Sequence, residues 1–244
     1  MNDTIWTIEL KIFRQRADAQ RYFQTFQIEI NPDEYVLDAI EKVWAFHDRS
    51  LTFRHACHHS TCGACGMLVN GIEKLTCITS IRSVTQNNGK LLIEPLRNFP
   101  VLSDLVVDTS SMFKALEEIG FNQVASLPSA CLPYERKTLE HERSEYQRLV
   151  DCIECGMCIS ACPVSLTDSN YLGPAVLAAA HDASSQPLSN KILEIVDSRD
   201  GLWRCHNAFE CSAVCPSNVE PGLRIMKMRQ TVIAHRIKKL FSRG

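Results

Sequence analysis

Eleven of the twelve cysteines fall into three groups whose spacings are those of metal ligands. The first group has the spacing C-x4-C-x2-C and gains another cysteine after the next eleven residues: Cys57, Cys62, Cys65 and Cys77. The second group has the spacing C-x2-C-x2-C-x3-C-P and comprises Cys152, Cys155, Cys158 and Cys162. The third group repeats the second imperfectly, with Cys205, Cys211 and Cys215. In a chain of 244 residues that shows no secretion signal, this count indicates metal ligands rather than a disulfide framework.

The composition excludes several classes of protein. A hydrophobic content of 45% with 22% charged residues is that of a soluble globular chain of about two domains. A net charge of −2, without a basic stripe beside aromatic residues, predicts no nucleic acid partner. No apolar run reaches the roughly 18 residues of a membrane span, and the first residues read as neither a signal peptide nor a transit peptide. We therefore expect a bacterial or archaeal cytoplasmic location.

The first part of the chain reads as mixed strand and helix. Apolar residues alternate with polar ones over residues 5–13 and 26–30, which predicts two half-buried strands that pair as a hairpin. Asn31, Pro32 and Glu34 have the pattern of a helix N-terminus, and apolar residues at helical spacing follow. Asn70 and Gly71 predict a hairpin turn between strands at 67–69 and 72–75, and a further strand is expected at 91–93.

From Val101 onward the strand signals fade. Residues 112–119, 139–150 and 223–240 have helical composition and spacing, so the second part is expected to be mostly α. We place the boundary between residues 1–104 and residues 105–244.

The first cysteine group has the plant-type ferredoxin spacing, which predicts a [2Fe-2S] cluster held by Cys57, Cys62, Cys65 and Cys77. A zinc site is the competing interpretation, but zinc sites usually pair two C-x2-C knuckles. His55, His58 and His59 crowd the same loop. They could tune the cluster, replace a ligand as in Rieske centres, or be ordinary surface histidines.

The second and third groups must be read crosswise, because the last cysteine of each bacterial ferredoxin run ligates the other cluster. Position 208, where the third group should have a cysteine, is Ala208. One cluster then has a full set of ligands for [4Fe-4S]: Cys152, Cys155, Cys158 and Cys215. The other has three thiolates, Cys162, Cys205 and Cys211, which suit a [3Fe-4S] cluster.

Two alternatives stay open for the last cluster. A fourth iron could be held by water, His206 or Glu210, which would make a labile [4Fe-4S] cluster. Interleaved zinc sites are the other alternative, although they would leave the ferredoxin spacings as coincidence. Cys131 lies outside all three groups and is expected to be an ordinary buried cysteine.

With these motifs in order, the chain resembles the iron-sulfur subunits of succinate dehydrogenase and fumarate reductase over nearly its whole length. The stretch at 95–100, the following Asp104 and Asp108, Gly173-Pro174 and the proline after each last cysteine also resemble that family. The resemblance implies an α+β fold, with a β-grasp plant-type ferredoxin domain followed by an all-α domain similar to bacterial ferredoxins.

The resemblance also implies which partner subunit lies beside each end of the chain. It implies a flavoprotein subunit, whose FAD oxidises succinate or reduces fumarate, beside the [2Fe-2S] domain. A membrane anchor with quinone, and possibly haem b, would lie beside the [3Fe-4S] cluster, so the chain would sit peripherally on the cytoplasmic face of the cell membrane. The chain itself has no G-x-G-x-x-G fingerprint for a flavin, so the dicarboxylate chemistry is expected in a partner.

Pro163 and His206 are the quinone-proximal residues that the resemblance implies. His206 could donate a proton to reduced quinone, or could hydrogen-bond the cluster surroundings. Two positions depart from the family. His58 stands where an arginine is common, and no tryptophan follows Cys162-Pro163, which is closer to fumarate reductases. The segment after Glu220 has no acidic residue and seven basic ones, which suits anionic headgroups, a membrane subunit or a solvated helix.

Other functions remain possible on these patterns. The chain could belong to a thiol-dependent fumarate reductase or a heterodisulfide reductase, or it could be a free multicluster ferredoxin that serves several acceptors.

Overall fold

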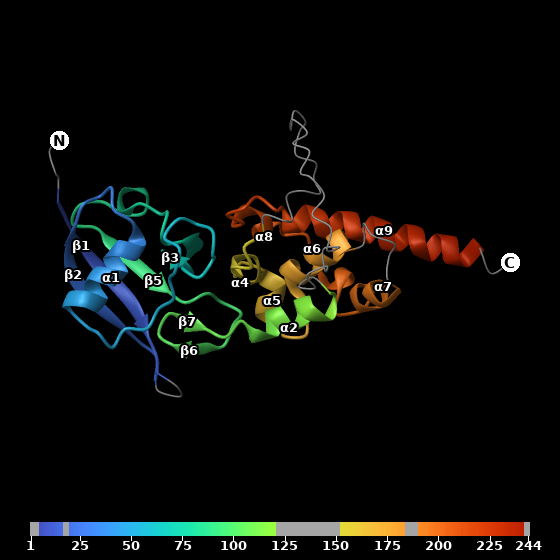
Figure 1. Cartoon of the computed structure of the whole chain (residues 1–244), viewed down its shortest axis with the longest axis horizontal. Coiled ribbons are helices and arrows are strands. Elements are labelled where there is room, and N and C mark those ends of the chain that lie inside the picture. Colours follow the sequence, from blue (N-terminus) through green and yellow to red (C-terminus); the bar gives the residue numbers. More distant parts are fainter. Residues whose placement is uncertain (1–4, 17–19, 121–151, 184–189, 242–244) are drawn as a thin grey trace, which may run out of the picture.

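The computed structural model describes residues 5–16, 20–120, 152–183 and 190–241. A sheet-containing part and a helical part lie side by side along the long axis of the molecule, as Figure 1 shows. The expected helix at 139–150 lies outside the described residues.

The first part is a five-stranded mixed sheet covered by one helix. The strand order is β2-β1-β5-β3-β4, in which β1 and β5 are parallel and the other neighbours antiparallel. The elements are β1 Trp6–Arg14, β2 Tyr22–Ile30, α1 Val36–Phe46, β3 Gly66–Val69, β4 Ile72–Leu75, the short 3-10 helix η1 Ile81–Ser83 and β5 Lys90–Glu94. The predicted strands and both hairpins are confirmed.

Alternating residues of the strands face α1 and form one core. Ile8, Leu10 and Ile12 of β1 are fully buried, and Ile40 and Val43 of α1 pack in the same cluster. The alternation predicted from the sequence thus becomes a half-buried sheet with its apolar face under a helix.

The predicted start of the helix is wrong. α1 begins at Val36, because Asn31 to Glu34 form a turn in which the Glu34 carboxylate accepts a hydrogen bond from Asn31 N at 3.2 Å. The backbone beyond that turn is used elsewhere: Val36 N donates to Thr79 O at 2.9 Å, and Ile81 N donates to Glu34 O at 2.9 Å. Tyr35 between the turn and the helix is extended and pairs with Ser80, so these long-range contacts delay the helix until Val36.

The second part is helical in the described residues, apart from a short strand pair that the sequence did not predict. β6 Val101–Ser103 and β7 Val106–Val107 pair at its start. The helices are α2 Ser110–Glu118, α4 Met157–Ser160, α5 Pro163–Thr167, α6 Gly173–Ala183, α7 Asn190–Val196, the 3-10 helix η2 Leu202–Arg204, α8 Glu210–Ala213 and α9 Pro221–Phe241. The helices expected at 112–119 and 223–240 are confirmed as α2 and α9. α6 packs on α9, whose far end points away from the sheet (Figure 1). None of the helices within the described ranges is both long and apolar enough to cross a bilayer.

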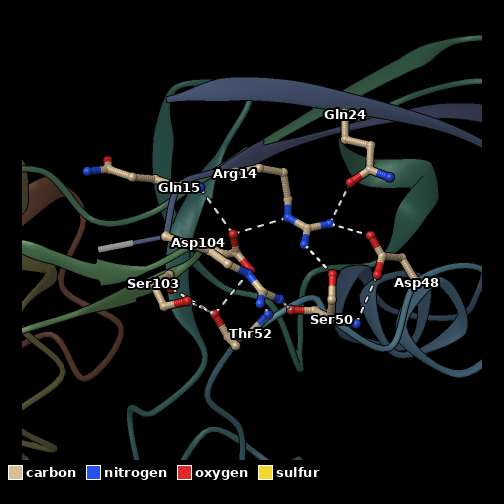
Figure 2. Close-up of polar contacts among 9 residues, drawn as sticks. Arg14, Gln15, Gln24, Asp48, Ser50, Thr52, Ser103 and Asp104 are labelled. Atoms are coloured by element: carbon tan, nitrogen blue, oxygen red, sulfur yellow. Dashed lines mark hydrogen bonds and ion pairs between the residues drawn. The ribbon is translucent and has the colours of Figure 1, made fainter. Parts of the chain in front are cut away.

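A buried polar network ties β1 to the β6–β7 turn (Figure 2). Arg14, which is 2% exposed, donates from Nε to Asp104 Oδ1 at 3.1 Å and from Nη1 to Asp48 at 2.8 Å. Asp104 also accepts from the backbone N of Gln15 at 3.1 Å and of Thr52 at 2.9 Å. Burial lowers the pKa of Arg14, but the hydrogen bonds to Asp48 and Asp104 outweigh burial and raise it. The ion pair therefore stays charged and fixes the segment that leads into the first cysteine loop.

The two parts share a continuous apolar and polar interface. One core cluster includes Leu96 and Phe99 of the connecting segment together with Met157 and Ile159 of α4. Asn98 Nδ2 donates to the carbonyl oxygens of residues 159, 160 and 162 at 2.8, 3.0 and 3.1 Å. The helical cysteine runs are thereby held against the sheet.

Candidate metal centres

The first cysteine group is gathered by one loop and the turn after β4. Cys57 and Cys62 lie on the outer side of the loop, whereas Cys65 and Cys77 are buried at 3% exposure. Thr76, next to Cys77, donates to Cys65 O from its backbone N at 3.2 Å and from its hydroxyl at 3.0 Å. The backbone therefore joins the last two cysteines of the group.

The thiols of this group are in different electrostatic states. Hydrogen bonds from the Thr61 side chain and the His59 backbone lower the pKa of Cys57 to about 5. Burial raises the pKa of Cys77 to about 11, and the hydrogen bond with Cys65 adds to the rise. A buried thiol becomes a thiolate ligand only when a cation replaces its proton, so binding of metal and loss of protons are linked.

A pocket in the helical part, called the second pocket after the second cysteine group, brings together Cys152, Cys155, Cys158 and Cys215. Its other walls are largely apolar, with Met112, Leu116, Ala175, Ala178, Ala179 and Val219 among them. Burial raises the pKa of Cys155 to about 11, and the neighbouring Cys152 and Cys215 thiols add to the rise. Cys215, from the far end of the sequence, thus lies with the first three cysteines of the earlier run.

The third pocket contains Cys162, Cys205 and Cys211, together with Pro163, His206, Ala208 and Glu210. Pro163 is the first residue of α5, and His206 is exposed. Ala208 lines this pocket with a methyl group, which offers no donor atom. Burial raises the pKa of Cys211 to about 11, and the Cys162 and Cys205 thiols act in the same direction.

Tyr171 is a residue of the third pocket that the sequence pattern did not single out. Its side chain is 7% exposed, and its hydroxyl has no nitrogen or oxygen hydrogen-bond partner among the described residues, but it lies within reach of the Cys205 thiol. Burial raises the pKa of Tyr171 well above its ordinary value, and the thiols of Cys205 and Cys162 raise it further. A buried phenol beside three thiols is a hydrogen-bond donor that has no protein nitrogen or oxygen to satisfy it.

The donor sets fit iron-sulfur clusters. Thiols line the second and third pockets, the second pocket is walled by apolar side chains, and the buried Tyr171 hydroxyl is available to a cluster sulfur in the third. Gly63, at φ +69°, has no room for a side chain, because a Cβ atom there would lie 2.7 Å from Cys155 Cβ. The loop of the first group therefore touches the second group directly.

The three histidines of the first loop lie together only in part. His55 Nδ1 and His58 Nε2 lie 2.9 Å apart, next to Glu41, whereas His59 is exposed and uses its backbone N–H on Cys57 Sγ at 3.4 Å. The nitrogens of His55 and His58 that face Glu41 are turned to one another. Cys131 lies outside the described residues.

Comparison with known proteins gives the family. Residues 9–114 match a 2Fe-2S iron-sulfur cluster binding domain, and residues 148–219 match a 4Fe-4S dicluster domain. The fumarate reductase iron-sulfur subunit of Mycobacterium tuberculosis is 31% identical over 96% of this chain and 95% of the relative, and that of Haemophilus influenzae is 31% identical over 92% and 91%. The structure of the Mycobacterium smegmatis Sdh1 complex in the apo form contains a chain with a TM-score of 0.79 and 25% identity, which covers 96% of this chain and 98% of that one.

The cysteine pockets, the two matched domains and the near full-length similarity agree on one kind of molecule, an oxidoreductase subunit with an α+β fold that transfers electrons. The chain belongs to the iron-sulfur subunits of fumarate reductase and succinate dehydrogenase.

Proposed function

We propose that this subunit carries electrons between the FAD of a flavoprotein subunit and quinone in a membrane anchor, and that it holds [2Fe-2S], [4Fe-4S] and [3Fe-4S] clusters in that order. The proposed ligands are Cys57, Cys62, Cys65 and Cys77 for the first, Cys152, Cys155, Cys158 and Cys215 for the second, and Cys162, Cys205 and Cys211 for the third. Each cluster, when bound, supplies a centre that accepts and releases one electron.

The contiguity of the three thiol groups carries this proposal. Gly63 of the first loop packs on Cys155, and the Cys211 thiol is close enough to Cys158 to raise the pKa of that thiol, after burial and two nearer cysteines. A chain that only connects a flavin site and a quinone site in its partner subunits needs neither a flavin-binding fingerprint nor a membrane-spanning segment of its own.

The surface at the third pocket supports contact with a membrane subunit. Pro163, His206 and Phe209 line the pocket and are exposed, Phe209 at 44%, and Leu166, 67% exposed, lies on α5, which begins at Pro163. Exposed apolar groups gathered beside a buried site favour a protein interface. We therefore propose this face as the contact with an anchor that binds quinone and possibly haem b, on the cytoplasmic face of the membrane.

The two proposed domains of the chain meet near residue 104. Leu105 packs in the core of the sheet, whereas Val107 and Met112 pack in the core of the helical part. The change of core at residues 105–107 lies next to the boundary that we propose between a first domain of residues 1–104 and a second of 105–244, while Leu96 and Phe99 reach across it into the helical core.

Replacing Ala208 with cysteine tests the cluster assignment. Ala208→Cys adds the missing thiol to the third pocket, so we expect the EPR signal of an oxidised [3Fe-4S] cluster to be replaced by that of a reduced [4Fe-4S] cluster. The iron content should rise from about nine to about ten per chain, since one corner of the cube is filled.

Ala213→Cys is the matched control, because Ala213 is exposed on the same helix as Cys211 and does not line the pocket. It should leave the iron content and the EPR signal unchanged. A wild-type chain that shows no three-iron signal, or that binds zinc at the eleven cysteines, refutes the assignment. If His206→Ala or Glu210→Gln alone alters the cluster type, the third site holds a labile [4Fe-4S] cluster and not the proposed [3Fe-4S] cluster.

The electron donor is a separate question from the clusters. The purified complex should oxidise quinol and reduce fumarate, or run the reverse reaction. Activity with thiol donors in place of quinol would move the chain to a thiol-dependent reductase.

A further inference from the structure

Three metal-binding side chains converge outside the cysteine pockets, where α1 meets the first loop. Glu41 Oε1 lies 3.3 Å from His55 Nδ1 and 3.5 Å from His58 Nε2, and the two imidazole nitrogens are 2.9 Å apart. These three side chains lie close enough to one another to hold one metal ion. Glu41 Oε1 is itself buried and has no hydrogen-bond partner in the part of the chain that the structure describes.

The separations are those of ligands around one small cation. Zinc binds imidazole nitrogen and carboxylate oxygen at about 2.0–2.2 Å in tetrahedral geometry, which sets neighbouring ligand atoms about 3.3 Å apart. The three observed separations surround that value. A hydrogen bond between His55 Nδ1 and His58 Nε2 satisfies those two nitrogens only, whereas a cation bound among the three atoms would also satisfy Glu41 Oε1.

The surrounding chain orients both rings. Phe53 stacks on the His55 ring with centroids 5.2 Å apart and planes at 19°. The His55 and His58 rings then meet edge to face, at 5.1 Å and 82°. Packing that fixes a ligand in place reduces the side-chain entropy lost when metal binds.

We propose that Glu41, His55 and His58 form a binding site for a divalent first-row transition metal, zinc foremost, with water completing the coordination. Two imidazoles and one glutamate suit zinc, and they leave an open position. The site is exposed to solvent, since the three side chains are 32%, 40% and 45% exposed. The site therefore lies at the surface, with Glu41 Oε1 on its inner side.

Bound metal would act on the neighbouring cysteine site, a consequence that rests on the proposed function. His58 follows Cys57 directly, so a divalent charge would sit beside the ligands of the [2Fe-2S] cluster. Positive charge favours the reduced cluster, which carries one more negative charge, and so raises its reduction potential. The site would couple metal availability to electron exchange between the [2Fe-2S] cluster and the flavoprotein.

Zinc titration of the full chain with its clusters loaded tests the site, after removal of loose metal with a chelator. Calorimetry should give one tight zinc per chain, and zinc X-ray absorption should show nitrogen and oxygen ligands without sulfur. His55→Gln, His58→Gln and Glu41→Gln should each weaken zinc binding at least about tenfold. His59→Gln is the matched control, because it removes a histidine of the same loop that lies outside the group, and it should bind zinc as the wild type does.

Visible absorbance of the clusters in each variant checks that the fold is retained. Equal zinc affinity in His58→Gln, or sulfur scattering in the zinc spectrum, overturns the site. The [2Fe-2S] potential should move positive with zinc in the wild type and stay fixed in His58→Gln. Tight zinc binding without that movement overturns the coupling, and a chain that binds zinc but lacks [2Fe-2S] refutes the proposed function instead.

Discussion

At the scale of single residues, the third pocket depends on which donors face it. Cys162, Cys205 and Cys211 supply sulfur, Ala208 supplies none, and the Tyr171 hydroxyl is buried beside them with no nitrogen or oxygen partner in the part of the chain that the structure describes. Hydrogen bonds to cluster sulfurs stabilise the reduced state, because it is the more negative one. Tyr171 is therefore expected to tune the proposed three-iron cluster rather than to hold it.

Tyr171→Phe removes the hydroxyl and keeps the ring. We expect the potential of the third cluster to fall by on the order of 60 mV, the equivalent of about 1.4 kcal/mol, which is the size of one hydrogen bond to a charged group. Redox titration followed by EPR measures it. Tyr22→Phe on β2, where the ring is 54% exposed, should change no potential. An unchanged third potential in Tyr171→Phe would show that the hydroxyl donates elsewhere.

The cysteine positions could be predicted as candidate ligands because their spacing along the chain is itself informative. Tyr171 and Glu41 could not, since each has an unremarkable sequence neighbourhood and gains its role only when distant segments meet. The sequence shows His55, His58 and His59 as one group of loop histidines, but Glu41 lies on a helix fourteen residues before His55. Local patterns carry no information on such a contact.

At the scale of elements, most strands and helices follow from apolar periodicity, and the failures come from long-range hydrogen bonds. The turn at Asn31 has the side-chain pattern of a helix start, yet Tyr35 after it is extended and pairs with Ser80, so the helix begins only at Val36. The pair β6–β7 is too short for periodicity to detect, and Asp104 between its strands is fixed by Arg14 from β1. Tertiary contacts here override local preference.

The contact between the first loop and the second cysteine run can be tested by adding one methyl group. Gly63→Ala places an alanine in a left-handed backbone conformation, which is strained, and also brings a Cβ atom to 2.7 Å from Cys155 Cβ. Gly71→Ala, at φ +83°, has the same backbone cost, but its nearest neighbour is Arg97 Nη2 at 3.8 Å. We expect the apparent Tm to fall by about 2–4 °C for Gly71→Ala and by roughly 5–10 °C for Gly63→Ala.

Loss of visible absorbance on anaerobic heating at one fixed rate measures both variants. The magnetic interaction between the first two clusters should also weaken in Gly63→Ala and persist in Gly71→Ala. Equal Tm values for the two variants would mean that the first cysteine loop and the second cysteine run separate without loss of stability, so that their contact does not position them.

At the scale of the whole molecule, the sheet and the helical part act together only if the seam between them stays closed. Ser160, 2% exposed, donates to Glu73 of β4 at 2.7 Å and accepts from Arg97 N at 2.9 Å. Asn98 covers three carbonyl oxygens of the segment that ends in Cys162. The seam thus runs from the sheet to a proposed ligand of the last cluster, which makes it a route by which the two domains fix each other.

Asn98→Asp tests that seam with a change of one side-chain atom. The carboxylate donates no hydrogen bond and places negative charge against three carbonyl oxygens, so we expect a loss of about 2–3 kcal/mol and an apparent Tm lower by about 5–10 °C. Asn88→Asp is the control, since Asn88 has a similar positive φ of 58° against 64°, but an exposed side chain. Because the strain and the chemical change match, a difference between the two variants reports the partly buried setting of Asn98 and its carbonyl contacts. If Asn98→Asp unfolds in the same range as Asn88→Asp, the two domains are held by their shared apolar core, and the polar seam only sets their register.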